Sequence, residues 1–157
     1  MSPQQSAEPC IWLNDDAEAA IRFYVDLVPD SAIHSLSSIA DPQGHPTVLA
    51  SFRLGGVNYR AIGGPAGFAL NEAFSISLNC ADQAETDHYW AALSQGGIEG
   101  ACGWVRDRWG LWWQVVPSRL GELLSDPNPN RAQAARQAMF GMSRIIIAEM
   151  EAAADAA

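Results

Sequence analysis

Apolar residues along the chain follow a pattern of one strand, one helix and several further strands, and this pattern occurs twice. In its first occurrence, Cys10 to Leu13 forms a short apolar run, and Ala17 to Val28 then places apolar residues at helical spacing. Segments typical of strands follow at residues 32–39, 47–54 and 57–62. Gly55-Gly56 joins the last two, and this dipeptide tolerates the positive φ of a hairpin turn. The pattern predicts a βαβββ module over residues 9–64.

The second occurrence begins with a strand-like segment at residues 73–80 and continues with a helical segment at 83–94. Its predicted buried face consists of Thr86, Tyr89, Trp90 and Leu93. Further strands are expected at 98–101, 102–106 and 111–116. Each helix follows the sequence Asp-x-Ala-Glu, at Asp15 and again at Asp82, and in such a cap the Asp accepts backbone amides while the Glu reaches back. This repetition indicates an α+β fold of two βαβββ modules, at about 9–64 and 73–117.

The character of the chain changes after Pro117. A short helix is expected at 118–125, and a final helix is expected to begin near Asn130. The apolar stripe of the final helix consists of Ala135, Met139, Met142, Ile146 and Met150. This stripe needs a groove, which belongs either to the sheet of its own chain or to a partner subunit. We expect one domain over 1–157, with C-terminal helices at 118–154 and a frayed end from Ala152 onward.

Four of the six tryptophans lie between Cys102 and Pro117, in two short β-prone runs on either side of Asp107-Arg108-Trp109-Gly110. These runs predict a hairpin. Alternation in its second strand places Trp112, Gln114 and Val116 on one face and Leu111, Trp113 and Val115 on the other. A strand that is apolar on both faces is covered on both, so one face is expected to pack on a helix and the other to line a cavity. Plain core packing of the tryptophans is the alternative.

Charge and cysteine content narrow the classes of partner. The formal net charge of −9 over 157 residues argues against nucleic acid and anionic membranes, which leaves a small molecule or another protein. Three scattered cysteines without a CxxC pair indicate neither a disulfide framework nor a zinc site, and we expect them to be small buried hydrophobes. The sequence shows neither a secretory signal nor an apolar run long enough to span a bilayer, so a cytoplasmic protein is expected.

Several separated motifs, in a consistent order, resemble those of the vicinal oxygen chelate superfamily (glyoxalase I, bleomycin-resistance proteins and extradiol dioxygenases). Within it the chain is similar to the PhnB-like, 3-demethylubiquinone-9 3-methyltransferase-like branch. The residues that carry the resemblance are Cys10-Ile-Trp-Leu, Ala17-Glu18, Phe23-Tyr24, Pro29-Asp30-Ser31, Gly63-Gly64-Pro65, Asn79-Cys80-x-Asp82-Gln83-Ala84-Glu85, Cys102-Gly103-Trp104, Asp107-Arg108-x-Gly110 and Trp113-Gln114-x-Val116-Pro117. The resemblance implies paired modules whose curved, glyoxalase-like mixed sheets enclose a cavity, commonly completed in a homodimer.

Metal-dependent members of this superfamily place His, Gln or Glu ligands on the first and last strands of each module. In this chain the first strand offers only a thiol, Phe74-Ser75 stands where a ligand histidine is expected, and residues 57–62 contain no carboxylate. Gln114 takes the position of the final glutamate, and one neutral amide cannot hold a divalent ion. His34, His45 and His88 share no ligand spacing. We therefore expect neither metal nor cofactor.

The leading hypothesis is a metal-free homodimer that binds a small, partly apolar or aromatic molecule. Trp12, Trp104 and Trp112 would be the walls, Gln114 the polar anchor, and Ser75, Ser77 and Asn79 the further lining. An ion pair at a sheet edge is the favoured role for Arg60 and for Arg106 to Arg108, and Arg60 would attract an anionic ligand if it faces the cavity. The alternatives are a metal-dependent lyase, isomerase or dioxygenase, and a purely structural interaction module. A methyltransferase of the Rossmann type would need a doubly wound sheet, which the repeat does not predict.

Overall fold

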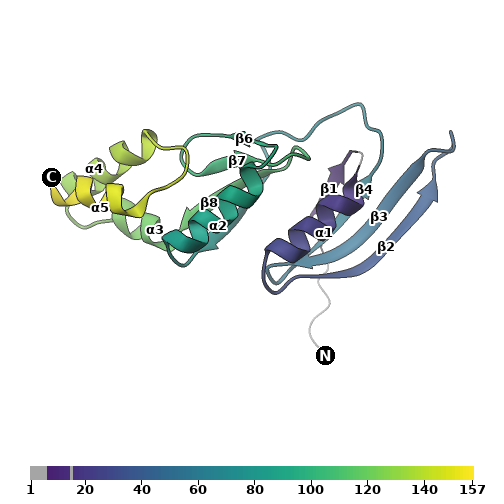
Figure 1. Ribbon diagram of the computed structural model, residues 1–157, viewed down its shortest axis with the longest axis horizontal. Coiled ribbons are helices and arrows are strands. Elements are labelled where there is room, and N and C mark those ends of the chain that lie inside the picture. Colours follow the sequence, from purple (N-terminus) through teal and green to yellow (C-terminus); the bar gives the residue numbers. More distant parts are fainter. Residues whose placement is uncertain (1–6, 15) are drawn as a thin grey trace. The chain divides into compact units, whose positions relative to one another are not determined.

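The computed structural model describes residues 7–14 and 16–157, and its chain divides into two compact units, Met1–Leu70 and Asn71–Ala157. Each unit contains one βαβββ module with a four-stranded mixed sheet, as the repeat predicted (Figure 1). The α+β fold class and the two modules are thus confirmed.

The N-terminal module has its strands in the order β1-β4-β3-β2, with β1 parallel to β4 and the other neighbours antiparallel. Its elements are β1 (Cys10–Leu13), α1 (Ala17–Leu27), β2 (Ala32–Ala40), β3 (Pro46–Leu54) and β4 (Val57–Gly63). Gly55 and Gly56 both have positive φ in the β3–β4 turn, as expected for this hairpin dipeptide.

Helix α1 covers one face of this sheet, and β1 and the second half of β3 alternate buried side chains toward it with more exposed ones on the other face. The buried residues on the helix and on the strands beneath it include Ile11, Leu13, Ala17, Ala20, Ile21, Tyr24, Phe52 and Ala61. Gly63 permits a close approach, since a Cβ at this position would lie 2.2 Å from Cβ of Ala17. The opposite face of the sheet is not covered by α1 and carries half-exposed side chains such as Trp12 and Ile62.

The start of α1 differs from the predicted capping box. Asp15, the expected cap, lies outside the described residues. Asp16 immediately precedes the helix with a φ of 64°, and among the described residues its side chain makes no capping hydrogen bond. Among the described residues, Glu18 accepts hydrogen bonds from Arg22, one turn later, at 2.7 and 2.9 Å. An exposed pair at this spacing is a common helix-surface interaction.

The C-terminal module repeats the same topology, with strand order β5-β8-β7-β6 and β5 parallel to β8. Its elements are β5 (Ser75–Cys80), α2 (Gln83–Ser94), β6 (Ile98–Glu99), β7 (Trp104–Arg106) and β8 (Trp112–Pro117). Here the predicted cap is present: Asp82 Oδ1 accepts from Glu85 N at 2.9 Å, and Glu85 accepts from Ala81 N at 2.6 Å. The four residues predicted to face inward from α2 are all buried.

The structure confirms the expected alternation in β8. Leu111, Trp113 and Val115 are completely buried on the side of α2, whereas Trp112, Gln114 and Val116 are half-buried on the opposite side. The turn before this strand is stabilised by a buried carboxylate, that of Asp107, whose Oδ1 accepts hydrogen bonds from the backbone of Trp109 and Leu111 at 2.9 and 3.0 Å. The hairpin therefore has an internal polar core instead of an exposed charged turn.

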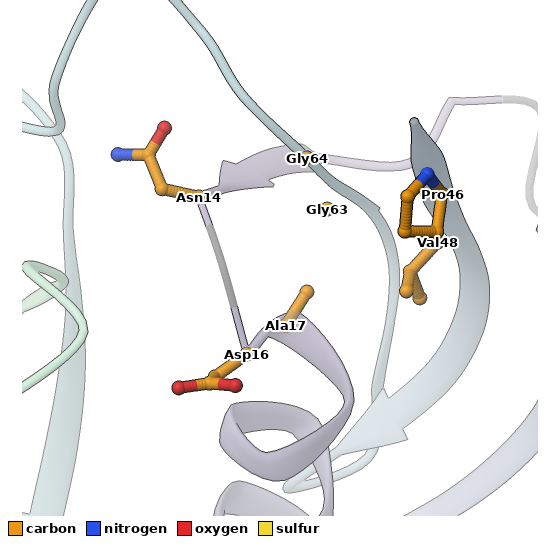
Figure 2. A pocket seen from close by; sticks show the side chains of 7 residues that line it. All are labelled: Asn14, Asp16, Ala17, Pro46, Val48, Gly63 and Gly64. Carbon is orange, nitrogen blue, oxygen red and sulfur yellow. The ribbon is translucent and has the colours of Figure 1, made fainter. Parts of the chain in front are cut away.

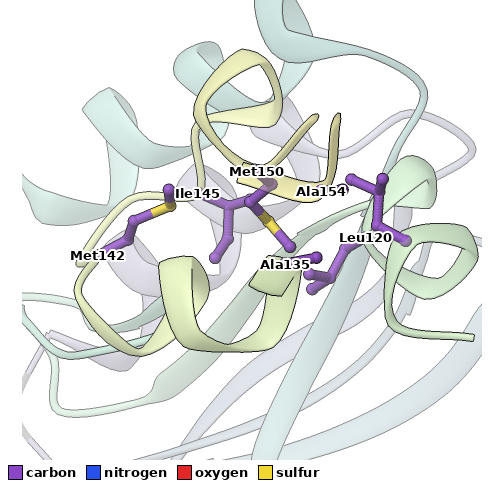
Figure 3. Close-up of a cluster of buried hydrophobic side chains, with 7 residues drawn as sticks. Leu120, Ala135, Met142, Ile145, Met150 and Ala154 are labelled. Atoms are coloured by element: carbon purple, nitrogen blue, oxygen red, sulfur yellow. The ribbon is translucent and has the colours of Figure 1, made fainter. Parts of the chain in front are cut away.

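The expected final helix is in fact two helices. After α3 (Ser118–Leu124) the chain forms α4 (Pro129–Phe140) and α5 (Ile147–Asp155), separated by a non-helical segment after Gly141. The residues of the predicted stripe nevertheless share one cluster. Ala135, Met142 and Met150 are buried in it (Figure 3). Met139 and Ile146 pack against its margin. The prediction of a single helix was wrong because the segment between α4 and α5 bonds to the C-terminal module. Cys102 N and Gly103 N donate hydrogen bonds to the carbonyls of residues 142 and 143.

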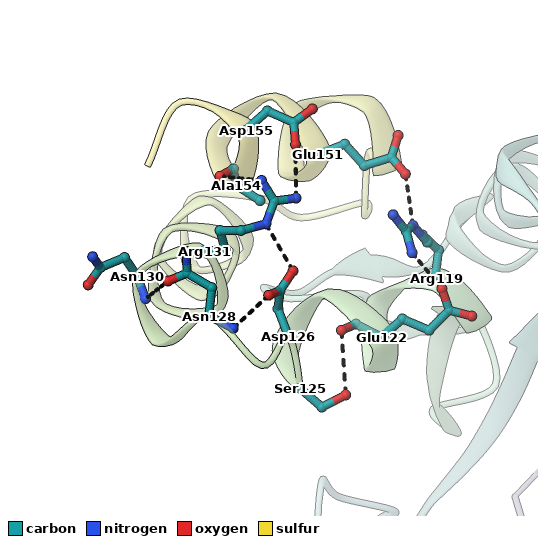
Figure 4. A network of polar contacts seen from close by, with 10 residues as sticks. All are labelled: Arg119, Glu122, Ser125, Asp126, Asn128, Asn130, Arg131, Glu151, Ala154 and Asp155. Atoms are coloured by element: carbon teal, nitrogen blue, oxygen red, sulfur yellow. Dashed lines mark hydrogen bonds and ion pairs between the residues drawn. The ribbon is translucent and has the colours of Figure 1, made fainter.

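The C-terminal helices thus pack on their own chain, and an ion-pair network joins them (Figure 4). Arg119 on α3 contacts Glu122 and Glu151, and Arg131 on α4 contacts Asp126 and Asp155. Arg131 also donates to the Ala154 carbonyl at 3.1 Å. The end of the chain was expected to fray from Ala152, but α5 continues to Asp155 and Ala154 is fully buried. None of the described helices is long and apolar enough to cross a membrane.

Candidate functional site

The candidate site residues of the C-terminal module gather on the uncovered face of its sheet. Strand register places Ser77 beside Gln114 and Gln114 beside Trp104 in one row across three strands. The adjacent row runs from Ser75 through Trp112 to Arg106. Asn79 follows Ser77 on the same side of β5, at the level of Val116. All six residues predicted for this module therefore share one face.

Gln114 and the two tryptophans form the centre of this face. The Gln114 side-chain amide donates from Nε2 to Ser75 Oγ at 2.9 Å, which fixes the orientation of the amide. The rings of Trp104 and Trp112 meet edge to face, with centroids 6.3 Å apart. A Cβ at Gly100 would lie 3.3 Å from the Trp112 ring, so this glycine lets the backbone pack against the aromatic pair. The result is a half-buried aromatic surface beside an oriented amide.

Arg106 belongs to the same face and was not expected there. The sequence treated it as a sheet-edge charge, but its side chain is half-buried next to Trp112, and its Nε is buried without a hydrogen-bond partner among the described residues. A desolvated guanidinium nitrogen without an acceptor is unfavourable, so this position favours an acceptor from outside the chain. The alternation of side chains along β7 could have placed Arg106 on this face, because Arg106 lies two residues after Trp104.

The C-terminal helical cluster closes one end of this face. Val116, which follows Gln114 on the same side of β8, packs against the cluster of Leu120, Met142 and Ile145. A Cβ at Gly103 would lie 3.2 Å from Ile145, which brings the segment between α4 and α5 close to the start of β7. The helices thus define where the open surface ends, and leave Gln114 and the two tryptophans uncovered.

In the N-terminal module, Trp12 and Arg60 lie on the corresponding uncovered face. Trp12 Nε1 donates to the Gly64 carbonyl at 3.2 Å, and its ring meets Phe68 edge to face at 5.3 Å. Arg60 lies on the inner strand β4, and its Nε pairs with Glu8 at 3.0 Å. Cys10 is exposed on this face, contrary to the expectation that every cysteine is buried; only Cys80 is fully buried. Burial raises the pKa of the Cys80 thiol, which keeps it protonated and unreactive.

Two shallow hollows border Arg60 on this face, with volumes of about 180 and 300 Å³. The first is lined by Ser35, Ser37, Leu49, Ala50, Ser51 and Arg60, and the second by Cys10, Leu49, Ala50, Arg60, Ala61 and Ile62. A third hollow of about 260 Å³ lies at the start of α1, where Asn14 and Asp16 stand across from Pro46 and Val48 (Figure 2). No sequence pattern predicted this last hollow, since its residues come from three segments of the chain: the start of α1, the start of β3 and the end of β4.

The donors on these faces do not fit a divalent metal ion. The uncovered sides of the first and last strands of each module present Cys10 and Trp12, then Asn58, Arg60 and Ile62, then Ser75, Ser77 and Asn79, and finally Trp112, Gln114 and Val116. This set contains no carboxylate and no imidazole, and Arg60 adds a positive charge that repels a cation. Within residues 7–14 and 16–157, no group of three His, Cys, Asp or Glu side chains could hold a metal ion.

The charged residues Asp107 and Arg108 contact groups within the tryptophan hairpin itself. Asp107 is buried and serves backbone and indole donors, and Arg108 lies 4.3 Å from the centroid of the Trp109 ring. Asp107 thus stabilises the turn.

Comparisons with known proteins agree with this architecture. A family model described as 3-demethylubiquinone-9 3-methyltransferase matches residues 5–116, which ends before α3. Among solved structures, the PhnB protein from Bacillus cereus is 27% identical, with a TM-score of 0.64, and the match covers 73% of this chain and 100% of that one. A protein from Pseudomonas aeruginosa is 19% identical with a TM-score of 0.55, over 69% and 95% of the two chains. The fosfomycin resistance protein FosX from Listeria monocytogenes is 12% identical with a TM-score of 0.47, over 70% and 91%.

A comparison with curated proteins gave no significant match. The family model covers both modules, and the PhnB protein matches along its whole length. The chain therefore belongs to the 3-demethylubiquinone-9 3-methyltransferase family and is similar to the PhnB protein.

Proposed function

We propose that this protein binds a small, partly apolar or aromatic molecule on the uncovered faces of its sheets, without a metal ion. The observation that carries the proposal is the half-buried aromatic pair Trp104 and Trp112 beside the oriented amide of Gln114. Aromatic walls with a few placed polar groups are typical of small-molecule sites. Ser75, Ser77 and Asn79 are the further contact residues on the C-terminal sheet. Trp12 and Arg60 are the contact residues on the separate uncovered face of the N-terminal sheet.

Metal independence follows from the donor set. The residues on these faces include amides, hydroxyls, a thiol and guanidinium groups, which can orient a ligand by hydrogen bonds but cannot replace the oxygen or imidazole ligands of a divalent ion. Stoichiometric zinc, nickel, manganese or iron in protein purified without a chelator would contradict this part of the proposal.

The sheets of this protein differ from those of a Rossmann-type methyltransferase. An S-adenosylmethionine site of the Rossmann type lies at the switch point of a doubly wound parallel sheet. Each module here has a mixed sheet with a single parallel strand pair. Binding without a reaction is the function that the geometry supports best.

The test is a screen of small aromatic compounds by tryptophan fluorescence and heteronuclear NMR. Gln114→Ala is expected to weaken a hit by about tenfold, the value of one or two lost hydrogen bonds, and to leave the melting temperature almost unchanged. Gln137→Ala, which removes an exposed glutamine on α4, is the matched control and should change neither property. If Gln114→Ala unfolds the protein, or if hits bind it as well as the wild type, the proposed anchor is wrong.

We also infer a homodimer, as is common in the vicinal oxygen chelate superfamily that the sequence resembles. Analytical ultracentrifugation at several concentrations tests this directly, and a monomer over the whole range would contradict it.

A further inference from the structure

Arg60 occupies the same place in the N-terminal module that Gln114 occupies in the C-terminal one. Each lies three residues before the end of the last strand of its module, and each is paired in register with a residue three positions before the end of the first strand. Those register partners are Cys10 and Ser77. The position equivalent to Gln114 therefore holds, in the N-terminal module, a fixed positive charge.

The surface around Arg60 is divided into a polar row and an apolar row. Register across the order β1-β4-β3-β2 places Cys10, Arg60, Ser51 and Ser35 side by side. The next row on the same face is Trp12, Ile62, Leu49 and Ser37. Arg60 and Leu49 line both neighbouring hollows, one bordered by three serine hydroxyls and the other by Ile62 and Cys10.

The guanidinium of Arg60 has donors to spare. Its side chain is 69% exposed. Among the described residues, Arg60 forms one ion pair, in which Nε donates a hydrogen bond to Glu8 Oε2 at 3.0 Å. Arginine carries five N–H donors in a planar fork, so the two terminal amino groups of Arg60, which lines both hollows, have donors without an acceptor among the described residues. Because the pair with Glu8 is exposed to water, it is weak and can be exchanged for another anion.

We propose that Arg60 anchors the oxyanion group of a small organic anion, with the serine hydroxyls as additional donors and the apolar body of the ligand lying over Leu49 and Ile62. Glu8 is an internal competitor, since its carboxylate occupies the same guanidinium. This inference rests on the proposed function, because it assigns the ligand class to an uncovered sheet face already taken as a binding surface. It goes further because it makes the positive charge of Arg60, rather than a metal ion, the feature that selects the ligand.

The probes are benzoate and phenyl phosphate, with benzamide as the neutral counterpart of benzoate, titrated by calorimetry and NMR. Benzoate or phenyl phosphate should bind the wild type, and benzamide should bind at least about tenfold more weakly. Comparing the two anions shows which oxyanion fits the serine row. Arg60→Gln should reduce anion binding by about tenfold or more and leave benzamide unaffected. The control is Arg22→Gln, which removes another paired arginine of the same module on the exposed side of α1 and should change nothing.

Glu8→Gln tests the competition, and it should tighten benzoate binding several-fold while leaving benzamide unchanged. Circular dichroism confirms that each variant is folded. Equal binding of benzoate and benzamide, insensitive to Arg60→Gln, overturns this inference but leaves small-molecule binding in place. If no probe binds the wild type, both proposals fail. An unchanged benzoate affinity in Glu8→Gln overturns the role of Glu8.

Discussion

Asp107 Oδ2 accepts a hydrogen bond from Trp113 Nε1 at 2.8 Å, and both side chains are buried. The other oxygen of the carboxylate accepts from two backbone amides of the turn. The Asp107 carboxylate thus stabilises both the buried indole of Trp113 and the turn that precedes β8. This arrangement separates Trp113, a core residue, from Trp112 and Trp104, which lie on the uncovered face.

Asp107→Ala should destabilise the C-terminal module by about 3 kcal/mol, because three donors in a buried turn lose their acceptor at once. Asp107→Asn should cost less, since one amide oxygen remains. Urea unfolding followed by tryptophan fluorescence measures both. Glu149→Ala, at an exposed position on α5, is the control; equal effects of the two alanine variants would show that the carboxylate has no structural role.

Gly63→Ala should lower stability by about 2 kcal/mol or more, because the new methyl group would overlap Cβ of Ala17 where β4 passes beneath α1. Gly67→Ala is matched to it, since a Cβ there meets nothing within 4 Å. Thermal unfolding of the two variants gives the comparison. A Gly63→Ala protein as stable as Gly67→Ala would mean that helix and sheet separate at little cost.

Gln83 connects α2 with the segment between α4 and α5. Its amide donates to the Ile145 carbonyl at 3.0 Å and accepts from Ile147 N at 2.8 Å. Gln83→Ala should therefore loosen that segment, with faster hydrogen exchange at the amide of Ile147 and a loss of about 1–2 kcal/mol. Gln95→Ala, at the exposed end of α2, should leave exchange unchanged. Unaltered protection in Gln83→Ala would mean that the apolar cluster alone holds the segment.

Acid should weaken the C-terminal helical network. The hydrogen bond from Asn128 N, followed by that from Arg131, holds the pKa of Asp126 below its usual range. A carboxylate whose pKa is lower when folded stabilises the protein above the unfolded pKa of about 3.9, and this contribution disappears as the pH falls through the folded value. The melting temperature should fall in this acidic range, and less steeply in Asp126→Asn. Identical pH profiles of the melting temperature for the two proteins would show that Asp126 does not contribute to the loss of stability in acid.

Much of the fold follows from the sequence because its signals are local and repeated. Strand alternation placed Trp112, Gln114 and Trp113 on their correct faces, and helical spacing identified the buried residues of α2. The cap at Asp82 is also a local feature, formed within one turn. These properties depend on backbone periodicity and on short-range hydrogen bonds, which neighbouring residues determine.

Other features depend on contacts between distant segments, and only the tertiary structure decided them. The final helix is interrupted because the backbone after Gly141 bonds to residues 102 and 103 and to Gln83. Strand register places Arg106 beside Trp112 and Arg60 beside Ser51. The segment before β1 brings Glu8 to Arg60. Amino-acid composition encodes neither placement. The sequence determined which side chains share a face of each strand; the pairing of the strands decided which charges and hydroxyls meet on it.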